Sequence, residues 1–311
     1  MKLVTFLDEQ PRTCLGALDA SGRVLDLAAA AAASNVSDGD FAADMLALID
    51  AGEVGLESAR AVFGFAAERD DASYWYEAKA VRLLPPLPRP RSFRDFWIFE
   101  QHVQMAWKLR GEPLPEVWHE MPTYYKGNAL AMIGSEEDLI WPSYTEKLDY
   151  ELEMGIIIGK GGRDIPAERG EGHIFGYTVL NDWSARDIQR KEMACKLGPA
   201  KGKDFATSIG PCIVTADEVD PYDLRMTARI NGETWSDNHS GTSYWKFGQL
   251  IAHVSMGETI HPGELFGSGT VGGGCGLELN RWLQPGDVVE LEIEQIGVLR
   301  NRVVKKEDGA P

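Results

Sequence analysis

Short apolar runs, several of them rich in β-branched residues, recur between residues 152 and 304 and predict a β-rich core. They cover residues 152–159, 173–181, 208–215, 225–230, 288–294 and 297–304. The pair Asn231-Gly232 predicts a two-residue hairpin turn. Helical patterns occur over residues 93–108, after a predicted N-cap at Ser184, and over residues 244–255. Because strands and helices do not alternate regularly, we predict a mostly β, α+β fold with helices packed outside the sheets.

The first 80 residues have a different pattern and predict a small N-terminal α/β domain. Short strands at residues 2–6, 14–19 and 23–25 precede helix-prone stretches at residues 27–33 and 41–51. Residues 81–91 contain four prolines, which cannot continue a helix or a central strand. We therefore expect a proline-rich linker at residues 81–92 and a larger domain at residues 93–311.

The composition restricts the partners of the chain. A hydrophobic content of 44% and nine tryptophans in 311 residues are typical of a globular protein. The formal net charge of −17 argues against nucleic acid and against anionic membrane surfaces, because both require a basic face. A small anionic substrate stays compatible with this charge if basic side chains gather in one pocket.

The sequence also predicts the compartment. It contains no apolar run of signal-peptide or transmembrane length. Cys14, Cys195, Cys212 and Cys275 lie far apart and form no Cys-x-x-Cys motif. We therefore expect reduced thiols in a soluble, cytoplasmic protein.

Glu151 and Glu153 are the first candidates for chemistry. They lie in a strand-like segment, where a side-chain period of two places both carboxylates on one face. Such carboxylates, about 5–7 Å apart, repel unless a cation lies between them. Oxygen ligands favour Mg²⁺, Mn²⁺ or Ca²⁺ over zinc. The alternative is an exposed edge strand with a solvated charged face.

A second candidate group follows the predicted strand at residues 173–181. Asp182 ends this strand, and Arg186 and Gln189 share one face of the next helix near its N-terminus. Free N–H groups and the helix dipole favour anions there. The group therefore predicts an anion-binding pocket beside a metal ligand, although an N-cap and two exposed polar residues would give the same pattern.

Seven short segments, spread over residues 93–280, together resemble the fumarylacetoacetate hydrolase family in their order and spacing. They are Asp95-Phe-Trp-Ile-Phe-Glu-Gln-His102, Tyr124-Tyr-Lys-Gly-Asn128, Glu151-Leu-Glu153, Asn181-Asp-Trp-Ser-Ala-Arg-Asp-Ile-Gln189, Gly202-Lys-Asp-Phe-Ala-Thr207, Gly267-Ser-Gly-Thr270 and Cys275-Gly-Leu-Glu278. The resemblance implies a β-roll catalytic domain and a homodimer.

The resemblance also implies roles for the residues that match the family motifs. They are Glu151, Glu153, Asp182 and Asp95 for the metal; His102, Glu278 and Lys203 for catalysis; and Tyr125, Arg186, Gln189 and Thr270 for substrate binding. His102 matches the general base, and Glu278 matches the carboxylate that orients it. Some members instead pair this histidine with a glutamate three residues on. Met105 occupies that position here, so Glu278 is the expected partner.

The implied reaction is hydrolysis of a carbon–carbon bond in a small anionic 1,3-diketo acid, such as fumarylacetoacetate, fumarylpyruvate or another acylpyruvate. Mg²⁺ is the expected cofactor, with Mn²⁺ or Ca²⁺ as alternatives, and would act as a Lewis acid. Three carboxylates, a divalent cation, Arg186 and Lys203 give the pocket a net positive charge, which suits such a substrate. Two alternatives remain: a 2-oxoacid decarboxylase, tautomerase or hydroxydienoate isomerase of the same family, and a non-catalytic metal-binding protein.

Overall fold

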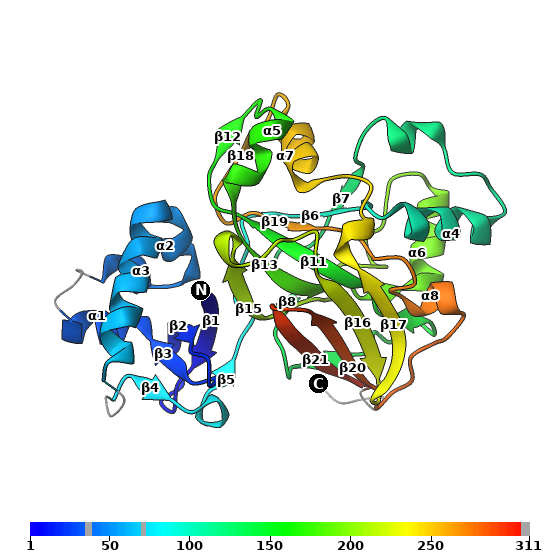
Figure 1. Ribbon diagram of the computed structural model, residues 1–311. Coiled ribbons are helices and arrows are strands. Elements are labelled where there is room, and N and C mark those ends of the chain that lie inside the picture. Colours follow the sequence, from blue (N-terminus) through cyan, green and yellow to red (C-terminus); the bar gives the residue numbers. More distant parts are fainter. Residues whose placement is uncertain (35–38, 70–72, 306–311) are drawn as a thin grey trace.

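Strand β11 (Leu152–Ile158) runs through the centre of the largest sheet, and all seven of its residues are buried. Its apolar, β-branched sequence suits this place, because a central strand is covered on both faces. It pairs antiparallel with β13 (Ile174–Asn181) on one side and with β19 (Leu265–Gly267) on the other. The computed structural model describes residues 1–34, 39–69 and 73–305, and in it this sheet joins the N-terminal part of the chain to the larger part (Figure 1).

Across the described residues, the strand order of this sheet is β4-β3-β2-β1-β15-β13-β11-β19-β6-β7, with β5 beside β1 and β8 beside β15. The other members are β1 (Lys2–Leu7), β2 (Thr13–Leu18), β3 (Val24–Asp26), β4 (Trp75–Tyr76), β5 (Arg82–Leu83), β6 (Phe93–Phe96), β7 (Tyr124–Lys126), β8 (Met132–Ile133) and β15 (Thr207–Thr215). Two short pairs lie outside it: β10 (Leu148–Asp149) with β14 (Ser184–Ala185), and β12 (Gly162–Arg163) with β18 (Thr259–Ile260).

A second sheet packs against the first and encloses the main core. Its order is β17-β16-β20-β21-β9, formed by β17 (Glu233–His239), β16 (Arg225–Ile230), β20 (Val288–Ile293), β21 (Gly297–Val304) and β9 (Asp138–Ile140). Met154 and Tyr177 of the first sheet share one apolar cluster with Leu291 of the second. The hairpin predicted at Asn231-Gly232 is confirmed, since both residues have positive φ, as a type I′ turn requires.

The N-terminal residues extend the large sheet, because β1 pairs antiparallel with β15. The predicted strands β1 to β3 and the first helix, α1 (Leu27–Ser34), are confirmed. The predicted helix at residues 41–51 is shorter: α2 (Met45–Asp50) follows a 3₁₀ turn, and α3 (Gly52–Ala67) comes after it. These helices share a second apolar cluster with one face of the large sheet. The predicted linker at residues 81–92, between an N-terminal domain and a larger domain, stays a prediction.

The helix predicted over residues 93–108 is wrong in its first part. Phe93–Phe96 form strand β6, whose four residues are all buried between β19 and β7. The spacing of the aromatic residues, three and four apart, fits one face of a helix. The segment is nevertheless a strand, because it pairs with a neighbouring strand on each of its two edges. Helix α4 (Glu100–Arg110) begins only afterwards and ends at Gly111, which has the left-handed conformation of a helix C-cap.

The N-cap predicted at Ser184 is also wrong. Ser184 belongs to β14, its hydroxyl donates to the Asp182 carbonyl, and α6 (Arg186–Ala194) begins after Ala185. The remaining helices are α5 (Ala167–Gly170), α7 (Phe247–Ser255), which confirms the predicted helix with a later start, and α8 (Gly276–Leu279). Among the described helices, none combines the length and the apolar character needed to span a bilayer.

Candidate active site

Three carboxylates from neighbouring strands converge beside β11. Glu153 lies on β11, Asp95 lies on β6, and Asp182 directly follows β13. One oxygen atom from each lies within 4.8 Å of the other two, and all three side chains are buried. Strand β19 separates β6 from β11, and a Cβ atom added at its Gly267 would lie 3.0 Å from Oε2 of Glu153. The missing side chain of Gly267 therefore leaves the space in which the carboxylates meet.

The polar atoms of this carboxylate triad fit a divalent cation. The Oδ1 atoms of Asp95 and Asp182 are buried, and neither has a hydrogen-bond partner among the described residues. Burial, together with repulsion from the neighbouring carboxylates, raises the pKa of Asp95 and of Glu153 well above the usual range. A cation bound to these oxygens would offset both effects, and an all-oxygen donor set favours Mg²⁺, Mn²⁺ or Ca²⁺.

Glu151, the fourth predicted metal ligand, lies beside the triad and is paired with basic groups of the chain. Lys203 Nζ donates to the carboxylates of Glu151 and Asp182, and Arg186 Nη2 lies 2.8 Å from Glu151 Oε1. Burial alone would raise the pKa of Glu151, but the two basic groups outweigh it and the pKa is lowered. The alternative of an exposed edge strand is wrong, because Glu151 and Glu153 are only 3% and 0% exposed.

Helix α6 positions two predicted substrate-binding residues at its first turn. Arg186 is its first residue, and Nη1 of Arg186 donates to Oε1 of Gln189 over 3.1 Å. Nε of Arg186 donates to Asp149, which is fully buried and also accepts from the N–H groups of Gly276 and Leu277. Asp149 is not among the residues predicted from the sequence, although its two-residue alternation with Glu151 is a signal that points to it. Asp149, and Asp95 from the triad, add two carboxylates to the three counted for the pocket, so the predicted net positive charge is not reached.

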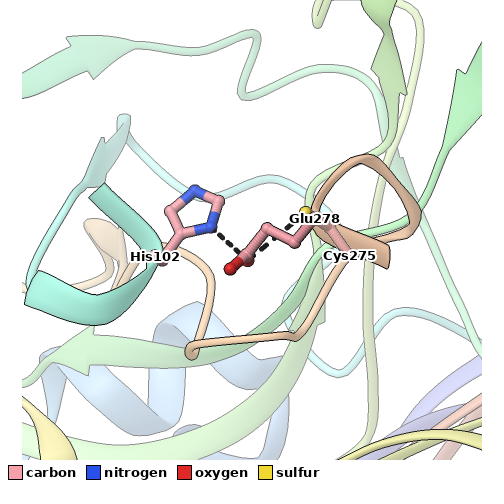
Figure 2. A group of neighbouring side chains, drawn as sticks. All are labelled: His102, Cys275 and Glu278. Carbon is pink, nitrogen blue, oxygen red and sulfur yellow. Dashed lines mark hydrogen bonds and ion pairs between the residues drawn. The ribbon is translucent and has the colours of Figure 1, made fainter. Parts of the chain in front are cut away.

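The predicted histidine–glutamate pair is also present at the site. Nδ1 of His102, on α4, lies 2.6 Å from Oε1 of Glu278, on α8. The other oxygen of Glu278 accepts a hydrogen bond from the N–H of Gly273, which fixes the orientation of the carboxylate. Figure 2 shows the Cys275 side chain reaching the same carboxylate, and Sγ of Cys275 lies 3.6 Å from Oε1. The second ring nitrogen of His102 points away from Glu278 (Figure 2).

Two residues predicted to bind substrate also contact the carboxylate triad. The hydroxyl of Tyr125 donates to Asp182 Oδ2 over 2.6 Å, and the hydroxyl of Thr270 lies 3.4 Å from Glu153 Oε1. Both hydroxyls therefore hold a carboxylate in place, and Tyr125 also lines the cavity described next.

A cavity of about 230 Å³ connects these groups. Of the predicted residues, those that line it are Asp95, His102, Tyr125, Glu151, Arg186, Gln189 and Lys203. The other four predicted residues do not line it. Glu153 and Asp182 belong to the triad, Thr270 contacts Glu153, and Glu278 pairs with His102. Arg110 also lines the cavity but was not predicted. Its guanidinium lies over the rings of Trp107 and Trp97, 4.9 and 5.9 Å from their centres. A separate hollow on the second sheet contains none of the predicted residues.

The protein has a sheet-rich α+β fold. Buried carboxylates, basic groups and a histidine–glutamate pair surround one cavity, which is the arrangement of an enzyme active site. The family model for the fumarylacetoacetate (FAA) hydrolase C-terminal domain matches residues 92–304, so the chain belongs to the fumarylacetoacetate hydrolase family. The family assignment and the fold class predicted from the sequence are confirmed. Hydrolases, isomerases and tautomerases all occur among its relatives and structural neighbours.

Three similar proteins illustrate this range. The human mitochondrial oxaloacetate tautomerase FAHD2A is 34% identical over 226 residues, which cover 72% of this chain and 70% of that protein. The structure of a fumarylacetoacetate hydrolase from Exiguobacterium antarcticum matches 98% of this chain and all of its own, with a TM-score of 0.73 and 26% identity. A maleylpyruvate hydrolase from Sphingobium sp. SYK-6, in complex with manganese(II) and pyruvate, shares the fold, with a TM-score of 0.74, 23% identity and coverage of 99% and 100%.

Proposed function

We propose that this protein is a divalent-metal-dependent hydrolase that cleaves a carbon–carbon bond in a 1,3-diketo acid, with acylpyruvates as the substrate class. The observation that carries the proposal is the pairing of His102 with Glu278 on a cavity that Asp95, Glu151 and Lys203 also line. Hydrolysis needs a base for water and a place for the negative charge of the leaving carbon. This cavity contains groups suited to both tasks.

The histidine–glutamate pair provides the base. When Nδ1–H of His102 donates to Glu278, the lone pair of the second ring nitrogen, Nε2, is free to take a proton from water. Glu278 fixes this tautomer and stabilises the imidazolium that forms. His102 is 3% exposed, so bulk water does not compete for the ring. The same ring then returns its proton to the leaving carbon.

Basic groups in the same cavity as the histidine hold the negative charge. Lys203 and Arg186 line the cavity, and their own carboxylate partners fix them in position. Preorganised cations in a site shielded from water stabilise developing charge without reorganising during the reaction. Mg²⁺, or Mn²⁺ or Ca²⁺ in its place, would supply Lewis-acid chemistry at the substrate carbonyl. Asp95, Glu153 and Asp182 are the residues that would hold it, with Glu151 adjacent.

A 2-oxoacid tautomerase is the second candidate, because the human relative is named an oxaloacetate tautomerase. Tautomerisation moves a proton between carbon and oxygen and uses no hydrolytic water. Decarboxylation of a 2-oxoacid and isomerisation of a hydroxydienoate also need no such water. The products therefore distinguish the candidates.

The test follows the enol absorbance of acetylpyruvate, fumarylpyruvate and oxaloacetate, with Mg²⁺ and again with EDTA, and quantifies the acids formed. Metal-dependent formation of pyruvate and the matching carboxylic acid is the expected result. Faster enol–keto exchange of oxaloacetate, without new acids from any substrate, would replace the hydrolase with the tautomerase. Loss of carbon dioxide from oxaloacetate would instead indicate a decarboxylase.

We further propose that the protein is a cytoplasmic homodimer that takes a small anionic diketo acid. The resemblance of residues 93–280 to the family supports the dimer, and the basic groups Arg186, Lys203 and Arg110 in the cavity support the anionic substrate. Light scattering on the purified protein tests the dimer, since a mass near twice 34.3 kDa is expected.

A further inference from the structure

Figure 2 shows a second group of side chains that could bind a metal, formed by His102, Cys275 and Glu278. This group shares no residue with the carboxylate triad. A ring nitrogen of His102, Sγ of Cys275 and a carboxylate oxygen of Glu278 all lie within 4.8 Å of one another, and Nδ1 is the His102 nitrogen that faces Glu278. The thiol is fully buried and directed at Glu278. The proposed hydrolysis gives Cys275 no task, so its position at the histidine–glutamate pair calls for its own explanation.

The donor atoms differ in kind from those of the triad. A nitrogen, a sulfur and an oxygen are the ligands that zinc takes in tetrahedral sites, whereas an all-oxygen set favours harder cations. With zinc–ligand bonds of about 2.0–2.3 Å, ligand atoms of a tetrahedral site lie about 3.3–3.8 Å apart. The distance of 3.6 Å between Sγ of Cys275 and Oε1 of Glu278 is already in this range. The 2.6 Å between Nδ1 of His102 and Oε1 would have to increase by about 1 Å.

An ion can reach this group, and the group offers three protein ligands. His102 lines the cavity, and the fourth tetrahedral position can be filled by water, as in sites that have three protein ligands. The N–H of Gly273 holds the other oxygen of Glu278, so this ligand is preorganised. The backbone of Cys275 is held by a β-bridge to Glu151, and its side chain is fully buried.

We propose that His102, Cys275 and Glu278 form a zinc-binding site that switches the enzyme off. Binding replaces the proton of the Cys275 thiol, which goes to solvent, and the Nδ1 atom of His102 becomes a ligand. A neutral imidazole has one proton, so metal on Nδ1 keeps that proton on Nε2. Nε2 then has no lone pair with which to accept a proton from water. Zinc binding itself rests on the geometry alone, whereas the loss of activity rests on the proposed role of His102.

The first experiment titrates the purified, Mg²⁺-saturated protein with Co²⁺, a spectroscopic substitute for zinc, and follows the near-ultraviolet thiolate-to-cobalt charge-transfer band. The band is expected in the wild type at one equivalent. It is expected to be lost in Cys275→Ser and weakened in His102→Ala, and the matched control Cys195→Ser, which alters an exposed thiol, should retain it. No band in the wild type, or an equal band in Cys275→Ser, overturns the site.

The second experiment measures turnover against free Zn²⁺ at saturating Mg²⁺, with each variant normalised to its own zinc-free rate. Cys275→Ser should need at least about tenfold more zinc than the wild type for half inhibition, and Cys195→Ser should match the wild type. Equal inhibition of Cys275→Ser and the wild type would mean that zinc inhibits at the carboxylate triad, and it would overturn the proposed switch. A cobalt band without zinc inhibition would keep the site but contradict the role of His102 as general base.

Discussion

Nδ1 of His102 lies 2.6 Å from Oε1 of Glu278, although 176 residues separate them in the chain. Both side chains are almost completely buried, at 3% and 4% exposure, and only the fold brings α4 and α8 together. A buried imidazole with one nitrogen committed to a carboxylate presents a defined tautomer at the other nitrogen. This contact makes a specific mechanism testable.

His102→Ala should reduce hydrolytic turnover by about 10²–10⁴-fold while divalent-metal binding is retained, as expected for loss of a general base. Glu278→Gln should lower turnover less. The double variant should be little worse than His102→Ala, because residues that act as a unit are not additive. Steady-state rates with acetylpyruvate and Mn²⁺ binding measured by isothermal titration are the readouts.

His119→Ala is the matched control, because His119 also pairs with a glutamate, Glu100, but is exposed. This variant should keep nearly full turnover. Unchanged turnover in His102→Ala would contradict the hydrolytic mechanism and favour the tautomerase, which needs no activated water.

Removal of the metal should abolish activity reversibly, because the carboxylate triad has unpaired buried oxygens that fit a cation. EDTA treatment should stop turnover, and Mg²⁺ or Mn²⁺ should restore it. Substitution of a residue just outside the ligand shell typically weakens metal binding by about 10–100-fold. Glu153→Gln should weaken Mn²⁺ binding by more than this, because it removes a ligand. The exposed Glu57→Gln is the control. Equal Mn²⁺ affinity in the wild type and in Glu153→Gln would remove Glu153 from the ligand set.

Much of the site could be predicted because its residues lie in short local motifs. Alternation along β11 places Glu151 and Glu153 together, and the end of β13 places Asp182 beside them. Both signals depend only on neighbouring residues and on the geometry of a strand. The family resemblance then supplied the distant residues His102 and Glu278, which no local pattern connects.

The missed features depend on contacts between distant segments. The pairing of β1 with β15 joins residues more than 200 positions apart, as Lys2 lies opposite Val214. Strand β6 looked helical because its aromatic spacing fits a helix, and only pairing with β19 and β7 decides otherwise. Asp149 has a role only because the fold places Arg186 within hydrogen-bond distance of it. Propensity and periodicity carry no information on such partners.

Arg110 should select substrates with a second carboxylate. Its guanidinium is exposed at the cavity, lies over Trp107 and Trp97, and makes no hydrogen bond or ion pair with any described residue. Arg110→Gln should raise KM for fumarylpyruvate by about three- to tenfold, a modest effect because water screens this position. KM for acetylpyruvate, which lacks the distal carboxylate, should change little. Lys108→Gln, on the same helix and exposed, is the control, and equal effects on both substrates would contradict the role.

Glu192 should stabilise the turn that carries Lys203, and this stabilisation should depend on pH. Its carboxylate accepts from the N–H groups of Ala200, Lys201 and Gly202 over 2.7–3.0 Å. Glu192→Gln should lower the free energy of unfolding by about 1–2 kcal/mol at pH 7, because part of this charged interaction is lost. Turnover should also fall, since Lys203 follows the turn directly.

The pH dependence has a definite sign. Partial burial alone would raise the pKa of Glu192, but the three N–H groups outweigh it and lower the pKa below 4.5. A group with a lower pKa in the folded state contributes its stability above the unfolded pKa and loses it as the pH falls through the folded pKa. The difference between wild type and Glu192→Gln in urea denaturation should therefore be full at pH 7 and shrink as the pH falls below 4.5. The exposed Glu57→Gln should show no such change, and a difference that grows in acid would contradict the assignment.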